Sequence, residues 1–126
     1  MKKAAFVAGI IFSAGVIASA QMATIVMPPV RAGSLSGVVV DPNGAIIPHA
    51  SVSLISCPVG RGYPAPDNTV LKTTETDSHG EFSIKSDKFA KPYCLHLSAP
   101  GFDPLELEVK LAPSAGRMRL KMAIAN

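Results

Sequence analysis

Histidine and cysteine are the residues of this chain with the widest chemical range, and the chain has few of them. The histidines are His49, His79 and His96. Nucleophilic catalysis needs a Ser or Cys beside a base that a third group orients, and no Gly-x-Ser-x-Gly elbow accompanies these histidines. His79 falls in a predicted turn, and His96 is predicted to face outward beside Cys94. The sequence therefore predicts solvated or loop roles for the histidines and a protein that is not an enzyme.

A metal site would need several His, Asp or Glu side chains at ligand spacing. Asp77 and His79 are close in sequence, but they lack obvious further ligands. An Asp in this position can hydrogen-bond the backbone of its own turn. We interpret both as turn residues, and we predict neither a metal site nor a cofactor.

The two cysteines, Cys57 and Cys94, do not form a Cys-x-x-Cys arrangement. An even count in an exported chain favours a disulfide, whereas in a reducing compartment the two would be free thiols. Side chains alternate along a strand, so the apolar positions of the two segments turn both thiols to the outer face. If these strands are neighbours in one sheet, the bond closes a long loop and stabilises the fold by roughly 4 kcal/mol. The positions predicted to face the core are Val52, Leu54, Tyr93, Leu95 and Leu97.

The amino terminus has the pattern of a signal peptide at residues 1–20. Two lysines precede an apolar run over residues 4–17, and Ala18-Ser19-Ala20 offers small side chains for cleavage before Gln21. The alternative is an uncleaved membrane anchor, because apolar character continues to Val30. No cysteine follows the apolar run directly, which argues against a lipoprotein anchor. We therefore predict a secreted or periplasmic protein with a linker at residues 21–33 and one domain at residues 34–126.

The charge of the chain indicates no polyanionic partner. The formal net charge is +3, but Lys2 and Lys3 lie in the predicted signal peptide. The remainder is nearly balanced and contains no block of like charges, so neither nucleic acid nor an anionic membrane surface is predicted as a partner. A membrane contact is expected only if the amino-terminal segment is retained.

Short apolar segments separated by Gly, Pro, Asn and Asp predict an all-β sandwich. The clearest alternation is in the last two segments, where aliphatic side chains face inward. The residues predicted to face solvent there are Glu106, Glu108, Lys110, Arg117, Arg119 and Lys121. No helix of useful length is expected after the signal segment. The predicted strands are residues 35–40, 50–57, 69–75, 81–85, 93–98, 105–111 and 117–124.

Two turns and one long loop connect these strands. Asp41 and Gly44 bracket the first turn, and Asp77 and Gly80 bracket the second. In each, the Asp can bond the local backbone and the Gly can adopt positive φ. We predict that the second turn joins residues 69–75 and 81–85 as a hairpin. The segment after Cys57, rich in Pro and Gly, is predicted to be an irregular surface loop.

These segments resemble the carboxypeptidase regulatory-like domain over nearly all of the mature chain. The resemblance implies a seven-stranded Greek-key β-sandwich of the transthyretin-like type, in which the strand at residues 50–57 neighbours the strand at residues 93–98. That neighbourhood agrees with the predicted disulfide. Such domains are usually accessory modules beside enzymes, adhesins or outer-membrane receptors. The matching positions are Gly37, Val39, Asp41, Gly44, Ala50, Val52, Leu54, Thr76, Asp77, Gly80, Phe82, Ile84, Tyr93 and Gly101.

Two binding hypotheses follow for this non-catalytic module. The first is protein interaction through a sheet edge or an apolar patch, because Val38 and Val40 lie on the face opposite Val39. The lead-in or the loop after Cys57 could instead cover these two valines. The alternative is a carbohydrate-binding module, for which Tyr63 is the clear aromatic candidate. The expected partner is thus an unidentified envelope protein, with a polysaccharide as second choice.

Overall fold

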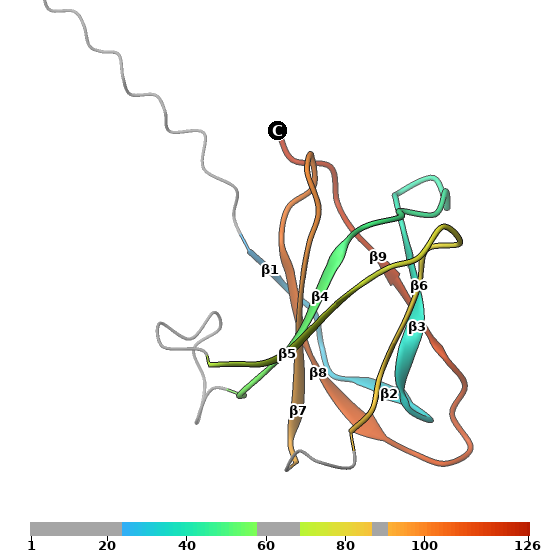
Figure 1. The fold of residues 1–126 in the computed structure, drawn as a ribbon, viewed down its shortest axis with the longest axis vertical. Helices are drawn as coiled ribbons and strands as arrows, with labels where there is room; N and C mark the ends of the chain where they lie inside the picture. The colour runs from blue at the N-terminus through green and yellow to red at the C-terminus, as the bar shows by residue number, and fades with distance from the viewer. Residues whose placement is uncertain (1–23, 58–68, 87–90) are drawn as a thin grey trace, which may run out of the picture.

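The computed structural model describes residues 24–57, 69–86 and 91–126. Within these ranges the regular secondary structure consists of β-strands (Figure 1). All seven predicted strands are present, which confirms the all-β prediction, and two short strands precede them. No helix in the described part of the chain is long and apolar enough to cross a membrane. The strands are β1 Ile25–Val26, β2 Val30–Ala32, β3 Leu35–Val40, β4 Ser51–Ile55, β5 Val70–Glu75, β6 Glu81–Ile84, β7 Tyr93–Ser98, β8 Leu105–Leu111 and β9 Met118–Lys121.

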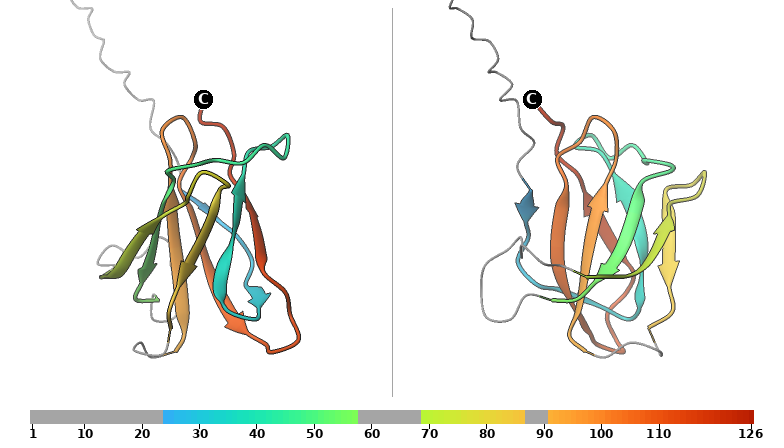
Figure 2. Two further views of the ribbon diagram at one scale, coloured as in Figure 1. Left: turned by 45° about the vertical axis from the view of Figure 1, so that its right-hand side comes forward. Right: turned by 60° about the vertical axis from the view of Figure 1, so that its left-hand side comes forward.

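The strands form two sheets that pack as a sandwich (Figure 2). The large sheet has the order β1-β8-β7-β4-β5, with β2 also paired to β8. The small sheet has the order β6-β3-β9, in which β3 is antiparallel to β6 and parallel to β9. The predicted neighbours β4 and β7 are paired, with Ile55 opposite Cys94.

The core lies between the sheets and follows the strand alternation read from the sequence. Alternate side chains of β4, β7 and β8 meet those of β3, β6 and β9, and all are almost fully buried. Burying each large aliphatic side chain stabilises the fold by about 1.5–3 kcal/mol. The largest contributors are Leu35, Leu54, Leu95, Leu97, Leu107, Leu120 and Met122.

The predicted hairpin between residues 69–75 and 81–85 is wrong. β5 pairs with β4 in the large sheet, whereas β6 pairs with β3 in the small sheet. The turn itself is closed, because Asp77 N–H donates to Glu81 O at 2.9 Å. On either side of it, however, Thr76 N–H donates to Ala50 O, and Val39 N–H donates to Gly80 O. These bonds draw the flanking strands into different sheets, so the turn is a corner of the sandwich.

Part of the segment predicted as a linker, residues 21–33, belongs to the sheet. β1 and β2 run parallel to β8 along its outer edge, on either side of Pro28-Pro29. Met27 N–H donates to Glu106 O at 3.0 Å, and Ala32 is fully buried. The chain thus covers one edge of the large sheet with its own backbone, a common protection against edge-to-edge association. The predicted signal peptide, residues 1–20, lies outside the described residues.

Candidate functional site

The two Asp/Gly turns have the same geometry. In the first, Asp41 Oδ1 accepts from the backbone N–H groups of Asn43 at 2.8 Å and Ala45 at 2.9 Å. Gly44 has φ +88°, which L side chains rarely adopt, and its N–H donates to Asp41 O. The Asp41 carboxylate therefore stabilises the backbone of its own turn.

The second turn repeats this arrangement. Asp77 Oδ1 accepts from Glu81 N–H at 3.0 Å and His79 N–H at 2.8 Å, and Gly80 has φ +74°. The bond from Glu81 N–H, followed by that from His79 N–H, lowers the pKa of Asp77, because both stabilise the charged carboxylate. Among the described residues, no three His, Cys, Asp or Glu side chains are grouped so that they could hold a metal ion.

Thr76 holds this corner to the rest of the domain. Its hydroxyl donates to Ile47 O at 2.7 Å and accepts from Ala50 N–H at 2.8 Å, and only 2% of the residue is exposed. Between those partners His49 has φ 61°, and its N–H donates to Thr76 O at 3.0 Å. Thr76 and Asp77, the polar motif residues of this turn, thus stabilise the backbone of the corner.

The outer face of the small sheet differs from the prediction at Val40. Val38 is half-buried there, but Val40 is only 1% exposed. The chain folds back after β3: Val40 bridges Ile46, and Ile47 N–H donates to Val39 O at 2.9 Å. The returning chain therefore lies beside the end of β3, with Ile46 next to the buried Val40. Ile46, which is 46% exposed, takes its place on the surface.

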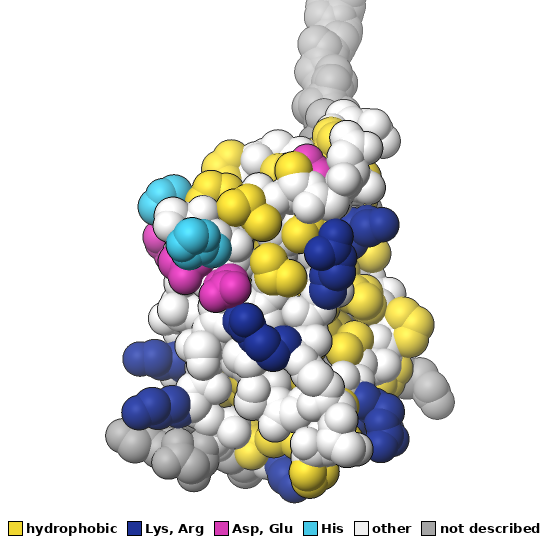
Figure 3. All heavy atoms as spheres, turned by 90° about the vertical axis from the view of Figure 1, so that its right-hand side faces the viewer, with side chains coloured by type: hydrophobic (Ala, Val, Ile, Leu, Met, Phe, Trp, Pro, Cys, Tyr) yellow, Lys and Arg dark blue, Asp and Glu magenta, His cyan; other side chains and the backbone are white. Residues whose placement is uncertain are grey.

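Charged side chains surround Val38 on this face. Its cross-strand neighbours are Glu81 on β6 and Arg119 on β9. Arg117 reaches across the sheet to Glu81 Oε2 at 3.4 Å and also donates to Gly37 O at 3.3 Å. Figure 3 looks onto the side of the molecule that carries the small sheet: apolar side chains gather in its upper part, acidic and histidine side chains lie at the upper left, and basic side chains lie to the right of them and below them. We call Val38, Ile46, Glu81, Arg117, Arg119 and Lys121 the small-sheet face.

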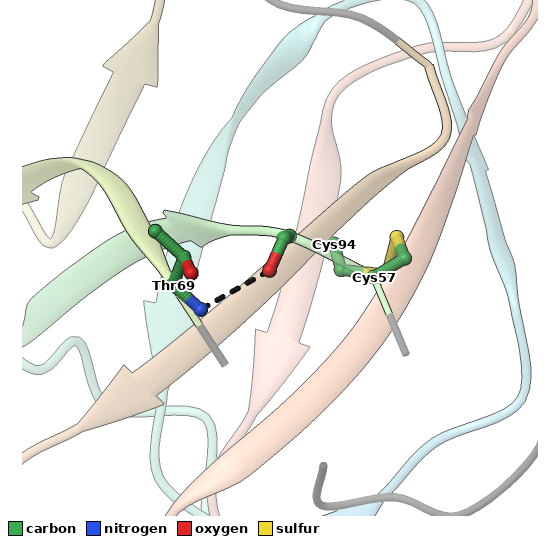
Figure 4. Close-up of a disulfide and its surroundings, with 4 residues drawn as sticks. Cys57, Thr69 and Cys94 are labelled. Atoms are coloured by element: carbon green, nitrogen blue, oxygen red, sulfur yellow. Dashed lines mark hydrogen bonds between the residues drawn. A yellow bond between two sulfur atoms is a disulfide. The ribbon is translucent and has the colours of Figure 1, made fainter. Parts of the chain in front are cut away.

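The predicted disulfide is confirmed. Cys57 and Cys94 are bonded, with their Cα atoms 5.2 Å apart and a sequence separation of 37 (Figure 4). Cys94 is fully buried even though it lies on the outer face of its sheet. Close by, Ser56 N–H donates to Thr69 O at 2.9 Å, and Thr69 N–H donates to Ser56 Oγ at 3.1 Å. The base of the long loop is thus fixed, while Tyr63 lies outside the described residues.

A polar row crosses the outer face of the large sheet, and one of its members contradicts the prediction. Glu106 was expected to face solvent, yet it is only 2% exposed. Its Oε2 lies 2.8 Å from His96 Nδ1, in the register that pairs β7 with β8. The row continues through Ser53, opposite His96, to Thr73 on β5. Alternation along β8 correctly predicted that Glu106 lies on the outer face of the sheet. Its burial and its pairing with His96 depend on the neighbouring strand β7, which the alternation does not identify.

The order Glu106, His96, Ser53 resembles the acid, base and nucleophile of a hydrolase, but the bonding differs. The Ser53 hydroxyl lies 3.0 Å from Thr73 Oγ1, on the side away from His96. A nucleophile must instead lie within hydrogen-bond reach of its base. The row is therefore a set of paired polar groups that links the strands of the sheet.

The fold and these turns define a class: a two-sheet β-sandwich whose motif residues hold corners and edges. A family model for the carboxypeptidase regulatory-like domain matches residues 34–123. The chain belongs to the carboxypeptidase regulatory-like domain family, and its sandwich is of the transthyretin-like type. The family assignment indicates a non-catalytic interaction module. No curated protein is significantly similar to the chain.

Proposed function

We propose that this protein is an exported, non-catalytic interaction module that binds another protein of the cell envelope through the small-sheet face. Two features support export. The first is the signal-peptide pattern of residues 1–20, and the second is the Cys57–Cys94 disulfide, which persists in oxidising compartments. Membership in a regulatory-like family supports a binding role.

The observation that carries the proposal is the exposed apolar centre of the small-sheet face. Ile46 is 46% exposed and pairs with Val40, two positions along β3 from the half-buried Val38, which lies between Glu81 and Arg119. An apolar centre with a polar rim is typical of protein interfaces. Arg119 and Lys121 are exposed on one flank, so the partner surface should present acidic groups there.

Carbohydrate binding is the weaker alternative. Sugar platforms usually need exposed aromatic rings, and Phe82 and Tyr93 are 4% and 7% exposed. The remaining candidate, Tyr63, is outside the described residues. The aliphatic small-sheet face therefore favours a protein as the partner.

Site-specific photo-cross-linking in cells tests the proposal. A photoreactive amino acid replaces Ile46 in one variant and Val26 in a control variant, because Val26 on β1 is apolar and similarly exposed, at 41%. We expect one discrete heterologous adduct from position 46 and none from position 26. Val38→Thr and Ile46→Thr together should weaken capture by the tagged protein while unfolding remains cooperative.

Two results would contradict the proposal. Equal labelling from both positions would mean that the small-sheet face has no specific partner. Retention of the purified domain on a polysaccharide, without any protein adduct, would favour the carbohydrate alternative.

A further inference from the structure

The two edges of the large sheet differ in whether another part of the chain pairs with them. The chain's own β1 and β2 cover the β8 edge, whereas β5 at the other edge pairs only with β4 among the described residues. β5 is exposed along most of its length, and Val70 and Leu71 are 59% and 42% exposed. An uncovered edge of this kind is a template for another strand.

The hydrogen-bond pattern identifies which backbone groups of β5 are available. Thr76 N–H donates to Ala50 O, and bonded pairs in an antiparallel ladder recur at every second residue. Thr74 and Lys72 therefore direct their backbone groups to β4. Thr73 and Glu75 direct theirs away from the sheet, where a further strand can pair with them.

We propose that β5 pairs with β5 of a second copy of this chain, antiparallel, about a two-fold axis at Thr73. The sheets of the two copies then join into one continuous sheet. The polar row of Glu106, His96, Ser53 and Thr73 would run without interruption from one copy into the other. This contact uses the large sheet, so it is independent of the small-sheet face and of the proposed function.

The charges of β5 select this register. Leu71, Thr73 and Glu75 direct their backbone groups outward. At least two of these residues in each copy can form bonded pairs only if the axis falls at Lys72, Thr73 or Thr74. An axis at Lys72 places two lysines directly opposite each other, which is destabilising. An axis at Thr74 opposes Lys72 with Thr76, which is buried in the corner. An axis at Thr73 pairs Lys72 with Thr74 of the other copy and uses the whole regular part of the strand.

The same features predict a weak dimer. A single strand pair buries less surface than standard stable interfaces do. The register shift between Leu54 and Ile55 interrupts the ladder near Val70 and limits regular pairing to the other end of β5. Association should therefore depend on concentration in the micromolar to millimolar range.

Sedimentation equilibrium of the mature protein, with its disulfide intact, tests the dimer. We expect the average mass to rise toward twice that of the monomer with concentration. Thr73→Pro should abolish this rise, because it removes an outward N–H that β4 does not use. Thr73→Val is the matched control: it also loses the bond to Ser53 but keeps the backbone donor, so it should still associate.

Disulfide trapping tests the register and does not depend on the proline variant. In the proposed dimer the two copies of residue 73 face each other with Cα atoms about 5.5 Å apart, within reach of a disulfide. Mild oxidation should cross-link Thr73→Cys. It should leave Glu75→Cys monomeric, since those two positions are about 13 Å apart at the strand rise. A monomer at all concentrations, a dimer that persists in Thr73→Pro, or cross-linking through position 75 instead of 73 would each overturn the proposal.

Discussion

The hydroxyl group of Thr76 should be worth more to the stability of this domain than its size suggests. Replacing it in Thr76→Val keeps the shape and the strand preference of the side chain but removes two hydrogen bonds. These are the bond to Ile47 O at 2.7 Å and the bond from Ala50 N–H at 2.8 Å. Thr76 is 2% exposed and Ala50 fully buried, so water cannot readily replace the lost partner.

The expected loss follows from those two bonds. A typical hydrogen bond contributes about 1 kcal/mol, and leaving a buried donor or acceptor unsatisfied costs about 1–3 kcal/mol. We expect Thr76→Val to lower the free energy of unfolding by about 2–4 kcal/mol. In a domain of this size that corresponds to a decrease in Tm of roughly 10–30 °C.

Urea unfolding with the disulfide intact measures this loss. Thr76→Ser keeps the hydroxyl and removes one methyl group, so it should cost only about 1 kcal/mol. Thr74→Val, two positions earlier on β5 and without a buried side-chain hydrogen bond, should change the free energy of unfolding by less than about 0.5 kcal/mol. If Thr76→Ser were as destabilising as Thr76→Val, packing and not hydrogen bonding would hold the corner, and the reasoning would be refuted.

Three further predictions concern the disulfide and the turns. Replacing Cys57 and Cys94 with Ser opens a loop of 37 positions and should cost about 4 kcal/mol in urea unfolding, and a loss below about 1 kcal/mol would contradict this. The lowered pKa of Asp77 means that its carboxylate stabilises the fold above its ordinary pKa of about 4, and that this contribution disappears as the pH falls through the lowered value. Stability measured from pH 5 to pH 2 should therefore fall more steeply for the unmodified protein than for Asp77→Asn, and parallel curves would refute the assignment. Gly80→Ala should be more destabilising than Gly101→Ala by at least about 1 kcal/mol in thermal unfolding, because both positions have positive φ but only at Gly80 would the new Cβ meet other atoms, the nearest at 2.9 Å.

Local patterns predicted much of this structure. Alternation and the turn residues between the segments predicted all seven core strands, because most of these strands have a buried face and side chains alternate with a period of two. β5, which is exposed along most of its length, was predicted from the turn that follows it. The spacing of Asp41 to Gly44 and of Asp77 to Gly80 identified both turns, because their bonds join residues within four positions of each other. The family resemblance supplied the neighbourhood of β4 and β7, in agreement with the disulfide that was predicted from the even cysteine count and the strand alternation.

The predictions that failed depend on contacts between distant segments. Val40 is buried where the chain turns back after β3 and pairs with it through Ile46. Glu106 is buried and paired because β7 places His96 beside it. The segment at residues 21–33 was predicted to be a linker between the signal peptide and the domain, whereas part of it pairs with the edge that β8 provides.

The sequence by itself determined the class of fold, the positions of its strands and the chemistry of its turns, since these depend on alternation and on bonds between near neighbours. Only the tertiary structure decided which faces remain exposed, where the chain changes sheets and which edge of the large sheet is covered. The physical reason is that burial and strand pairing are properties of surfaces that meet. A residue such as Ile46 becomes a candidate for binding only because the returning chain pairs it with Val40 and leaves Ile46 exposed while Val40 is buried.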